Sequence, residues 1–316
     1  MLMSKDVCRF APTASGRAHP GTLLAALLAW LDARSRGARF LLRVEDIDRD
    51  RVTEAFRTGL VDDLEWFGLD WDELSRQSGN RSDHEAALDS LAAKGRLYAC
   101  SCTRSVIKAA GLRSADGGYL YPGTCRRRRV ADWRSCPENL RCELSDFSIT
   151  LKDEGGLDCS QDISSAMGDP LLRRADGSVT YQLAVVADDA ASGVTRIVRG
   201  RDIAPSTATQ AVLYTLLERP LPVWRHHLLL LETRGGKFSK FHQAVGADTL
   251  RNFYAADTLC GILAHAAGLL DKPEPVTPEA LLSRFAWERV RRDDAALKWN
   301  GEALRLISSN HEIVTD

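Results

Sequence analysis

Two short segments of this 316-residue chain carry side chains suited to binding phosphate. The first, "HPGT", begins at His19 and places Gly21 just before a long apolar run, while the second, "GGKFSK", contains Lys237 and Lys240. An imidazole at a strand-to-helix turn donates a hydrogen bond to a phosphate oxygen, and lysines on a glycine-rich loop neutralise a triphosphate. Taken separately, the two segments also fit a histidine that caps a turn and a solvated lysine loop. Together they indicate a nucleotide site.

The segments around His19 predict the strand, helix and strand that must position this turn. "VCRFAP" is a short apolar run, and the helical run "LLAALLAWLDARSRG" follows it, with Thr22 as the expected N-cap and Gly37 as the end. "RFLLRVED" then suits a strand buried on both faces. Parallel strands joined by a helix place a ligand crevice at their carboxyl ends. We therefore predict an α/β fold of the Rossmann type with a doubly wound parallel sheet.

The rest of the chain alternates regular and irregular stretches. Two amphipathic helices end at Gly68 and Gly95, and an irregular stretch rich in Cys, Gly, Pro and Arg follows. "GSVTYQLAVVADDAASGVTRIVRGRDI" contains two β-rich runs, and helical patterns dominate after the lysine loop. The predicted parts are 1–95, the first half of the α/β domain; 96–165, an insertion; 166–235, the second half; and 236–316, the lysine loop with a C-terminal helical subdomain.

Composition excludes several classes of protein. With 44% hydrophobic residues and a formal net charge of -1, the chain can form a large core and is not uniformly basic. The apolar run after Thr22 ends in charged residues and is too short to cross a bilayer, and the charged start "MLMSKDVCRF" differs from a signal peptide. We therefore expect a cytoplasmic monomer without membrane association, whose eight cysteines are reduced.

The two phosphate-binding segments together resemble the signatures of class I aminoacyl-tRNA synthetases. That family has a His-x-Gly-His element and a Lys-Met-Ser-Lys-Ser element, and "HPGT" and "KFSKF" stand in their places. Thr22 replaces the second histidine and Phe241 replaces the final serine. The resemblance implies ATP with Mg²⁺ as a ligand. It implies His19, Gly21 and Lys240 as ATP-binding residues, and His19, Lys237 and Lys240 as catalytic residues.

Neighbouring segments resemble the glutamyl branch of this family. They are "RFAPTASG", "RVEDIDRDR", "TYQLAVVADD" and "VRGRD". By this resemblance, the residues that bind L-glutamate are Arg9, Ala11, Thr13, Glu45, Tyr181 and Arg199. The two arginines would bind carboxylates, Glu45 would meet the α-amino group, and Tyr181 would donate its hydroxyl; which arginine binds which carboxylate stays open. A zwitterionic acidic amino acid needs such a mixture of cations, an anion and hydroxyls.

The length of the chain indicates which members of the glutamyl branch it resembles most. Ordinary glutamyl-tRNA synthetases continue with a large helical anticodon-binding region, whereas only a short remainder follows "KFSK" here. This organisation, and the "VEDID" sequence, resemble the family of truncated paralogues, the glutamyl-queuosine tRNA(Asp) synthetases. The resemblance implies activation of glutamate with ATP and its transfer to the queuosine base in the anticodon of tRNA(Asp).

The cysteine spacing indicates a metal site. Cys100 and Cys102 form a close pair, with Cys125 further along the chain, although reduced thiols without a ligand fit this spacing equally well. The paralogue family has a zinc site built from Cys-x-Cys and Tyr-x-x-x-Cys. By resemblance, the structural Zn²⁺ ligands here are Cys100, Cys102, Tyr121 and Cys125. Cys136 or Cys142 stays open as a replacement for Tyr121.

A run of four arginines directly follows Cys125, in "CRRRR". It fits contact with tRNA phosphates and, almost equally, a solvated surface. Three other functions stay open at this point. They are a glutamyl-tRNA synthetase that has lost its anticodon region, a zinc-dependent RNA-binding module with decayed catalytic loops, and a class I nucleotidyltransferase that acts on a small molecule.

Overall fold

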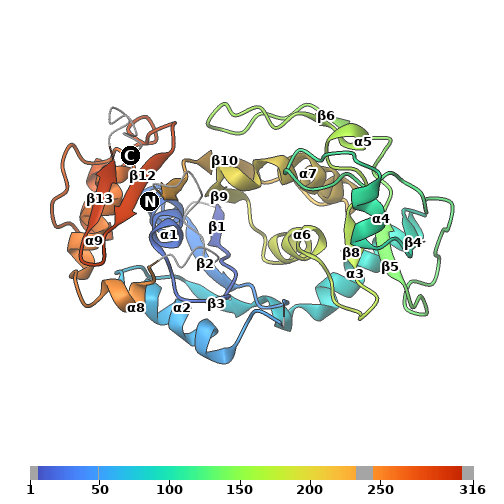
Figure 1. Cartoon of the computed structure of the whole chain (residues 1–316), viewed down its shortest axis with the longest axis horizontal. Helices are drawn as coiled ribbons and strands as arrows, with labels where there is room; N and C mark the ends of the chain where they lie inside the picture. The colour runs from blue at the N-terminus through green and yellow to red at the C-terminus, as the bar shows by residue number, and fades with distance from the viewer. Residues whose placement is uncertain (1–5, 49, 233–244, 308–316) are drawn as a thin grey trace, which may run out of the picture. The chain divides into compact units, whose positions relative to one another are not determined.

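The computed structural model describes residues 6–48, 50–232 and 245–307, and the chain divides into two compact units. The first unit contains 1–75, 197–201 and 226–316, and the second contains 76–196 and 202–225. Segments from both ends of the chain therefore build the first unit, which in Figure 1 contains both blue and red ribbon. The predicted division into four parts stays a prediction.

A five-stranded sheet takes most of its residues from the first unit and has the strand order β10-β9-β1-β2-β3. The strands are β1 (Val7–Phe10), β2 (Arg39–Val44), β3 (Glu73–Arg76), β9 (Arg196–Gly200) and β10 (Val223–His227). Strands β1 and β2 run parallel, with Val7 opposite Arg39 and Phe10 opposite Leu42. Since helix α1 (Pro20–Ser35) connects them, the predicted parallel strand-helix-strand unit is confirmed.

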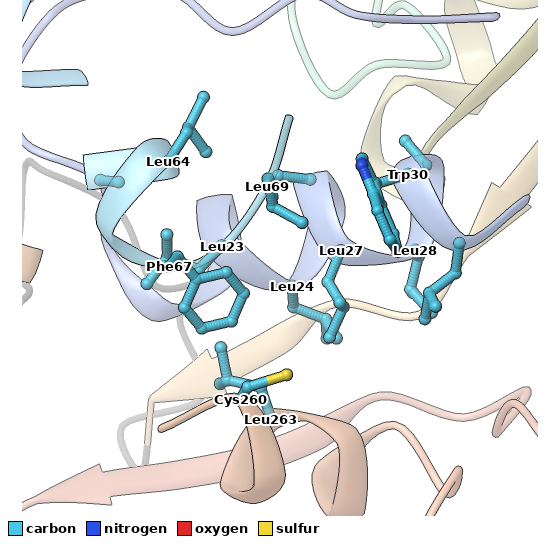
Figure 2. Packing of buried hydrophobic residues seen from close by; sticks show 14 of the residues in the cluster. Leu23, Leu24, Leu27, Leu28, Trp30, Leu64, Phe67, Leu69, Cys260 and Leu263 are labelled. Atoms are coloured by element: carbon cyan, nitrogen blue, oxygen red, sulfur yellow. The ribbon is translucent and has the colours of Figure 1, made fainter. Parts of the chain in front are cut away.

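Helix α1 lies in the centre of the hydrophobic core of this unit. Its buried residues occupy all sides of the helix, as expected for a core helix rather than a surface one. Figure 2 shows Leu23, Leu24 and Leu27 of α1 near Phe67 and near Cys260 of α9. Fully burying each such leucine stabilises the fold by about 1.5–3 kcal/mol. The helix is therefore a rigid support for the turn at its N-terminus.

The other helices of the first unit are α2 (Glu54–Trp66), α8 (Ala247–Leu250), α9 (Ala256–Ala266) and α10 (Pro278–Leu281), with a 3-10 turn at Leu282–Arg284. Helices were predicted in these regions. Three strands form a second sheet that was not predicted: β11 (Leu230–Glu232), β12 (Ala295–Trp299) and β13 (Leu304–Ile307). Strand β12 pairs in parallel with β11 and antiparallel with β13.

The second unit combines helices with short antiparallel strands. Its helices are α3 (Arg81–Ala93), α4 (Arg104–Ala109), α5 (Ile163–Ala166), α6 (Tyr181–Ala191) and α7 (Thr207–Leu216), with 3-10 turns at Gln77–Gly79 and Arg201–Ser206. Its strands are β4 (Leu97–Cys100), β5 (Asn139–Cys142), β6 (Ser148–Ile149), β7 (Gln161–Asp162) and β8 (Leu171–Arg173). Strands β4, β5 and β8 form one antiparallel sheet, and β6 pairs with β7.

One predicted strand is a helix in the structure. The run after Thr180 was expected to be β-rich, but it forms α6. Leu183–Asp189 are all buried, and α6 packs against both α3 and α7. A short apolar run without alternation fits a buried strand and a buried helix alike, which explains the error. The predicted helix ends at Gly68 and Gly95 are confirmed by φ angles of +89° and +66°, which favour glycine.

Among the described residues, no helix is both long enough and apolar enough to cross a membrane.

Candidate active site and metal centre

His19 is the N-cap of α1. Its backbone is extended, with φ -96° and ψ 168°, and its Nδ1 accepts a hydrogen bond of 3.3 Å from the backbone N–H of Thr22. The prediction that Thr22 is the N-cap is therefore wrong. Pro20, whose ring pre-sets a helical φ and which has no N–H to satisfy, already occupies the first turn, so the helix begins earlier.

This capping bond also sets the tautomer of His19. Because Nδ1 accepts a hydrogen bond, the neutral ring carries its proton on Nε2. The N-terminal turn of a helix offers backbone N–H groups and the positive end of the helix dipole, which together favour an anion. Gly21 lies in that turn and is only partly buried. His19 and Gly21 are thus brought together at a site suited to phosphate.

The predicted glutamate-binding residues of the first unit gather on neighbouring strands. Arg9 is a buried residue of β1, and Ala11 is the first residue after this strand. Glu45 directly follows β2, forms a parallel bridge with Thr13, and accepts a hydrogen bond of 3.5 Å from Thr13 Oγ1. Arg43 Nη2 lies 3.9 Å from Glu45 Oε1.

Arg199 completes this group from β9, the strand next to β1 in the sheet. It is buried, and its Nε donates a hydrogen bond of 3.2 Å to Nε2 of His226 in β10. Accepting this bond requires His226 to be unprotonated at Nε2. Among the predicted glutamate-binding residues, the guanidinium groups of Arg9 and Arg199 and the carboxylate of Glu45 are therefore all buried in the first unit, a mixture of charges that suits a zwitterionic acid.

Tyr181 lies in the second unit, as the first residue of α6 after the N-cap Thr180, in the run that was expected to be β-rich. Its role stays a prediction. Lys237 and Lys240 lie outside the described residues, so their predicted roles also stay predictions.

The structure brings the predicted metal ligands together. The sulfur atoms of Cys100, Cys102 and Cys125 all lie within 4.8 Å of one another, and those of Cys102 and Cys125 are 3.7 Å apart. The hydroxyl oxygen of Tyr121 lies 3.6 Å from Cys100 Sγ. Cys100 ends β4, and the other three groups come from the irregular chain that follows it.

These separations fit a tetrahedral zinc ion. With Zn–S bonds of about 2.3 Å, two sulfur ligands of a tetrahedron lie about 3.8 Å apart; a sulfur and an oxygen ligand lie about 3.5 Å apart. The alternative fourth ligands fit less well. Cys136 Sγ donates instead to the Glu138 carbonyl at 3.9 Å, and Cys142 faces Leu97 across the ladder of β4 and β5. Neither belongs to the cysteine cluster.

The thiols of this cluster have different proton affinities. Burial, assisted by a hydrogen bond with Cys125, raises the pKa of Cys102 to about 11. Burial acts in the same direction on Cys125, but hydrogen bonds from the Tyr121 hydroxyl and the Ser101 N–H outweigh it and lower the pKa to about 7. Burial also raises the pKa of Tyr121. A bound cation would favour the deprotonated form of each ligand.

A buried carboxylate, Asp169, supports residues beside the candidate metal site. Its oxygens accept hydrogen bonds from Tyr98 Oη at 2.7 Å, Arg126 Nε at 2.6 Å and the Leu144 N–H at 2.9 Å. The ring of Tyr98 in turn stacks against that of Tyr121, with centroids 6.3 Å apart. This network holds the ring of Tyr98, which stacks against Tyr121, the predicted fourth ligand.

The four arginines after Cys125 are mostly engaged within the protein. Arg126 pairs with Asp169, Arg128 with Glu138, and Arg129 with Glu143. Arg127 is exposed, and no ion pair of its side chain is described. Three of the four side chains thus have intramolecular partners, and contact of this run with RNA stays a prediction.

Three residues of these sites were not predicted. Asp63, Asp169 and His226 are buried or half-buried, and each contacts a predicted site residue or the loop that carries it. Asp63 and Asp169 sit in stretches where a carboxylate gives no periodic or spacing signal. Their partners are far away in sequence, so only the folded chain identifies them.

Comparisons with known proteins agree with this geometry. Residues 6–257 match the family model described as the catalytic domain of class I tRNA synthetases (E and Q). A Glutamyl-Q tRNA(Asp) synthetase of Symbiobacterium thermophilum is 43% identical over 310 residues, which cover 90% of this chain and 94% of that protein. The protein of the same name from Nocardia farcinica is 41% identical over 302 residues, covering 93% of each chain.

A solved structure supports the fold. A glutamate tRNA ligase from Elizabethkingia meningosepticum, in complex with its amino acid, superposes with a TM-score of 0.77. The match covers 93% of this chain and 67% of that one, at 24% sequence identity. The shared architecture is that of a class I synthetase, a family of ATP-dependent ligases. The chain belongs to the class I tRNA synthetases of the E and Q branch and, within them, to the Glutamyl-Q tRNA(Asp) synthetase family.

Proposed function

We propose that the protein activates L-glutamate with ATP and transfers the glutamyl group to the queuosine base in the anticodon of tRNA(Asp). The observation that carries the proposal is the match to Glutamyl-Q tRNA(Asp) synthetases over at least 90% of this chain and of those relatives. The acceptor in this proposal comes from the name of those relatives. The arrangement of His19, Arg9, Glu45 and Arg199 in the first unit supports the activation step.

In the first step, an α-carboxylate oxygen of glutamate forms a bond to the α-phosphorus of ATP, which enters as its Mg²⁺ complex. The bond between that phosphorus and the oxygen bridging to the β-phosphate breaks, and pyrophosphate leaves. Such phosphoryl chemistry relies on positioning and charge stabilisation. His19 would donate its Nε2 proton in a hydrogen bond to an α-phosphate oxygen, while Lys237 and Lys240 would neutralise the leaving pyrophosphate.

The amino acid would be held by the residues on the sheet. Arg9 and Arg199 would bind the two carboxylates, and Glu45 would accept hydrogen bonds from the ammonium group. Tyr181 would donate its hydroxyl, and the turn from Ala11 to Thr13 would form one wall of the pocket. Guanidinium groups bind carboxylates in a planar, two-pronged manner, which suits selection of a dicarboxylic acid.

In the second step, a hydroxyl of the queuosine cyclopentene ring would attack the carbonyl carbon of the glutamyl-adenylate. An ester forms, the bond from that carbon to the phosphate oxygen breaks, AMP leaves, and the hydroxyl proton passes to the leaving phosphate or to water. The mixed anhydride is already activated, so no side chain is assigned as a general base.

Zinc would have a structural task in this protein. Cys100, Cys102, Tyr121 and Cys125 would hold it, and it would tie together the irregular chain between β4 and β5. A closed site with four protein ligands supplies folding free energy and leaves no position open for a substrate. The chemistry of both transfer steps therefore falls to other residues.

The decisive experiment measures transfer of radiolabelled glutamate to tRNA(Asp) with and without queuosine. We expect labelling only of the queuosine-containing tRNA. As a second arm, the same tRNA is trimmed of its 3′-terminal adenosine, which removes the ordinary aminoacylation site; labelling should persist.

Charging of intact tRNA(Glu), with no charging once its 3′-terminal adenosine is removed, would instead identify a shortened glutamyl-tRNA synthetase. ATP-pyrophosphate exchange without glutamate would indicate a nucleotidyltransferase with another substrate. Either result contradicts the proposal.

A further inference from the structure

Asp63 of α2 is a fully buried carboxylate, with 0% of the residue exposed. Its Oδ2 accepts hydrogen bonds of 2.9 Å from Arg17 Nε and 2.9 Å from the backbone N–H of Ala18. Its Oδ1 pairs with Arg17 Nη2 and accepts a hydrogen bond of 3.0 Å from Arg251 Nη2. The proposed chemistry of the site does not use this group.

The partners of Asp63 lie directly before the proposed phosphate-binding residue. Ala18 is completely buried and immediately precedes His19, the N-cap of α1. The bond from the Ala18 N–H to Asp63 therefore fixes the peptide group between Arg17 and Ala18, directly before the peptide group that leads into His19. The backbone of His19 has little freedom left, because its other side is already part of the first helical turn.

The next peptide group, between Ala18 and His19, is held by a second segment of the chain. The Ala18 carbonyl accepts a hydrogen bond of 2.7 Å from the N–H of Ala247, at the start of α8. Arg251, which ends α8, donates from Nη2 to the Asp62 carbonyl at 2.6 Å and lies over the Trp66 ring at 4.8 Å. In the sequence, this anchored segment follows Lys237 and Lys240 by a few residues.

Two glycines leave space for Arg17 within this cluster. A methyl group at Gly59 of α2 would lie 3.1 Å from Arg17 Cδ, and one at Gly246 would lie 3.0 Å from Arg17 Cβ. The guanidinium group can therefore lie close against α2 and reach both oxygens of Asp63. A side chain at either position would displace it.

We propose that Asp63, together with Arg17 and Arg251, is a positioning residue for His19 in adenylate formation. Buried ion pairs contribute little net stability compared with apolar residues of similar size, and in some proteins they serve to specify one geometry. Here the geometry that is fixed is that of the two peptide groups before His19. The inference rests on the proposed activation of glutamate, and its test separates the two.

The primary variant is Asp63→Asn, which keeps the shape of the side chain and removes its charge. Its matched control is Asp32→Asn in α1, where an equally buried carboxylate accepts a hydrogen bond of 2.6 Å from Trp287 Nε1 and does not contact the His19 turn. In glutamate-dependent ATP-pyrophosphate exchange, Asp63→Asn should lower kcat on the order of 10²-fold, as expected for a displaced catalytic group. The KM values for ATP and glutamate should change little, and the control should keep its kcat.

A double variant tests whether Asp63 acts through His19. If it does, Asp63→Asn should cause almost no further loss of kcat in a His19→Asn background. Equal losses in both backgrounds, or a rise in KM with unchanged kcat, would overturn the inference.

Hydrogen exchange gives a readout that does not depend on activity. Asp63→Asn should accelerate amide exchange in peptides that cover residues 17–23 and 245–251, whereas Asp32→Asn should not. If the unaltered protein shows no glutamate-dependent ATP-pyrophosphate exchange, the proposed function fails. The amide hydrogen exchange measurement still decides the role of Asp63 in that case. Unchanged protection of both peptides contradicts that role.

Should Asp63→Asn fail to fold, Arg251→Gln takes its place, since it leaves Asp63 paired with Arg17. We expect the same pattern with a smaller loss of kcat, about tenfold. Full kcat together with unchanged protection of residues 17–23 in this variant would also overturn the inference.

Discussion

Each unit has a buried carboxylate that hydrogen-bonds to a predicted site segment or to a residue beside it. The segment is the turn at His19 in the first unit and the chain around Cys125 in the second, and the two segments are supported differently. Asp63 and Asp169 each accept hydrogen bonds from one backbone N–H and from at least one arginine side chain. In the first unit, the segment lies on α1 and the extensive apolar core around it. In the second unit, the core cluster at the segment consists of Tyr98, Cys100, Tyr121 and Cys125, of which three are predicted ligands.

This difference indicates how each site keeps its shape. Between Cys100 and Asn139, α4 is the single regular element, and most other backbone hydrogen bonds there belong to turns and isolated bridges. Where the first unit uses packed leucines, the second unit would use metal–ligand bonds. The turn at His19 should therefore survive metal removal, whereas the segment around Cys125 should not.

The largest expected effect is that of breaking the cysteine cluster. Cys125→Ser should abolish stoichiometric zinc and destabilise the second unit strongly, because a structural zinc site supplies on the order of 10 kcal/mol. Zinc content by elemental analysis and hydrogen exchange of residues 101–136 check this. Cys136→Ser is the control and should retain zinc. Full zinc binding by Cys125→Ser would exclude that ligand.

The first unit should respond to changes at His19 in activity rather than in fold. His19→Asn keeps an N-cap but removes the imidazole, so kcat for ATP-pyrophosphate exchange should fall about 10²- to 10³-fold, or roughly 3–4 kcal/mol. His19→Ala should lose as much activity and, in addition, about 1 kcal/mol of stability because the cap is lost. Chemical denaturation measures the loss of stability, and the kinetics of ATP-pyrophosphate exchange measure the loss of activity. Equal activity of His19→Asn and the unaltered protein would remove His19 from the mechanism.

Asp169→Asn should weaken both the fold and the metal site of the second unit. Loss of charge-assisted hydrogen bonds costs about 2 kcal/mol, and loss of support behind a ligand lowers zinc affinity by about tenfold or more. Competition with a chromogenic chelator measures the affinity. An unchanged affinity would show that the rings of Tyr98 and Tyr121 are held by packing alone.

Zinc affinity should rise with pH, because binding displaces protons from the thiols. Cys102, with a pKa of about 11, is protonated in the metal-free protein near neutrality, so affinity should increase at least about tenfold per pH unit. Below a pH of about 7, Cys125 is protonated as well, and the dependence should steepen. Titrations against a competing chelator at several pH values test this. A flat profile would mean that the thiols do not bind the metal as thiolates.

The smallest effect is expected at the arginine run. Arg127→Ala should weaken tRNA binding slightly and lower the salt dependence by about one phosphate contact, since this arginine has no described ion pair. Arg128 is already paired with Glu138, so its replacement should matter less for RNA. Filter binding at several salt concentrations measures both. Identical affinity of Arg127→Ala at low salt would show that this arginine does not contact the RNA.

The sequence predicted local patterns well and distant partners poorly. The strands on either side of α1 followed from short apolar runs, and the cysteine cluster followed from spacing and resemblance. The N-cap was wrong because Pro20 begins the helix earlier than Thr22 would, and α6 was mistaken for a strand because a helix buried on all sides shows no period. Asp63 was not predictable, since its contacts with Ala18 and Arg251 span 45 and 188 positions in the sequence.

The bond between Ala247 and Ala18 has a consequence for protein synthesis. A nascent chain leaves the ribosome from its N-terminus, at roughly 5–20 residues per second. The first strand and α1 emerge early, but the partner of the Ala18 carbonyl follows only on the order of ten seconds or more later. An incompletely translated chain therefore lacks the last contact that shapes the turn, and nucleotide binding should begin only when most of the polypeptide has been made.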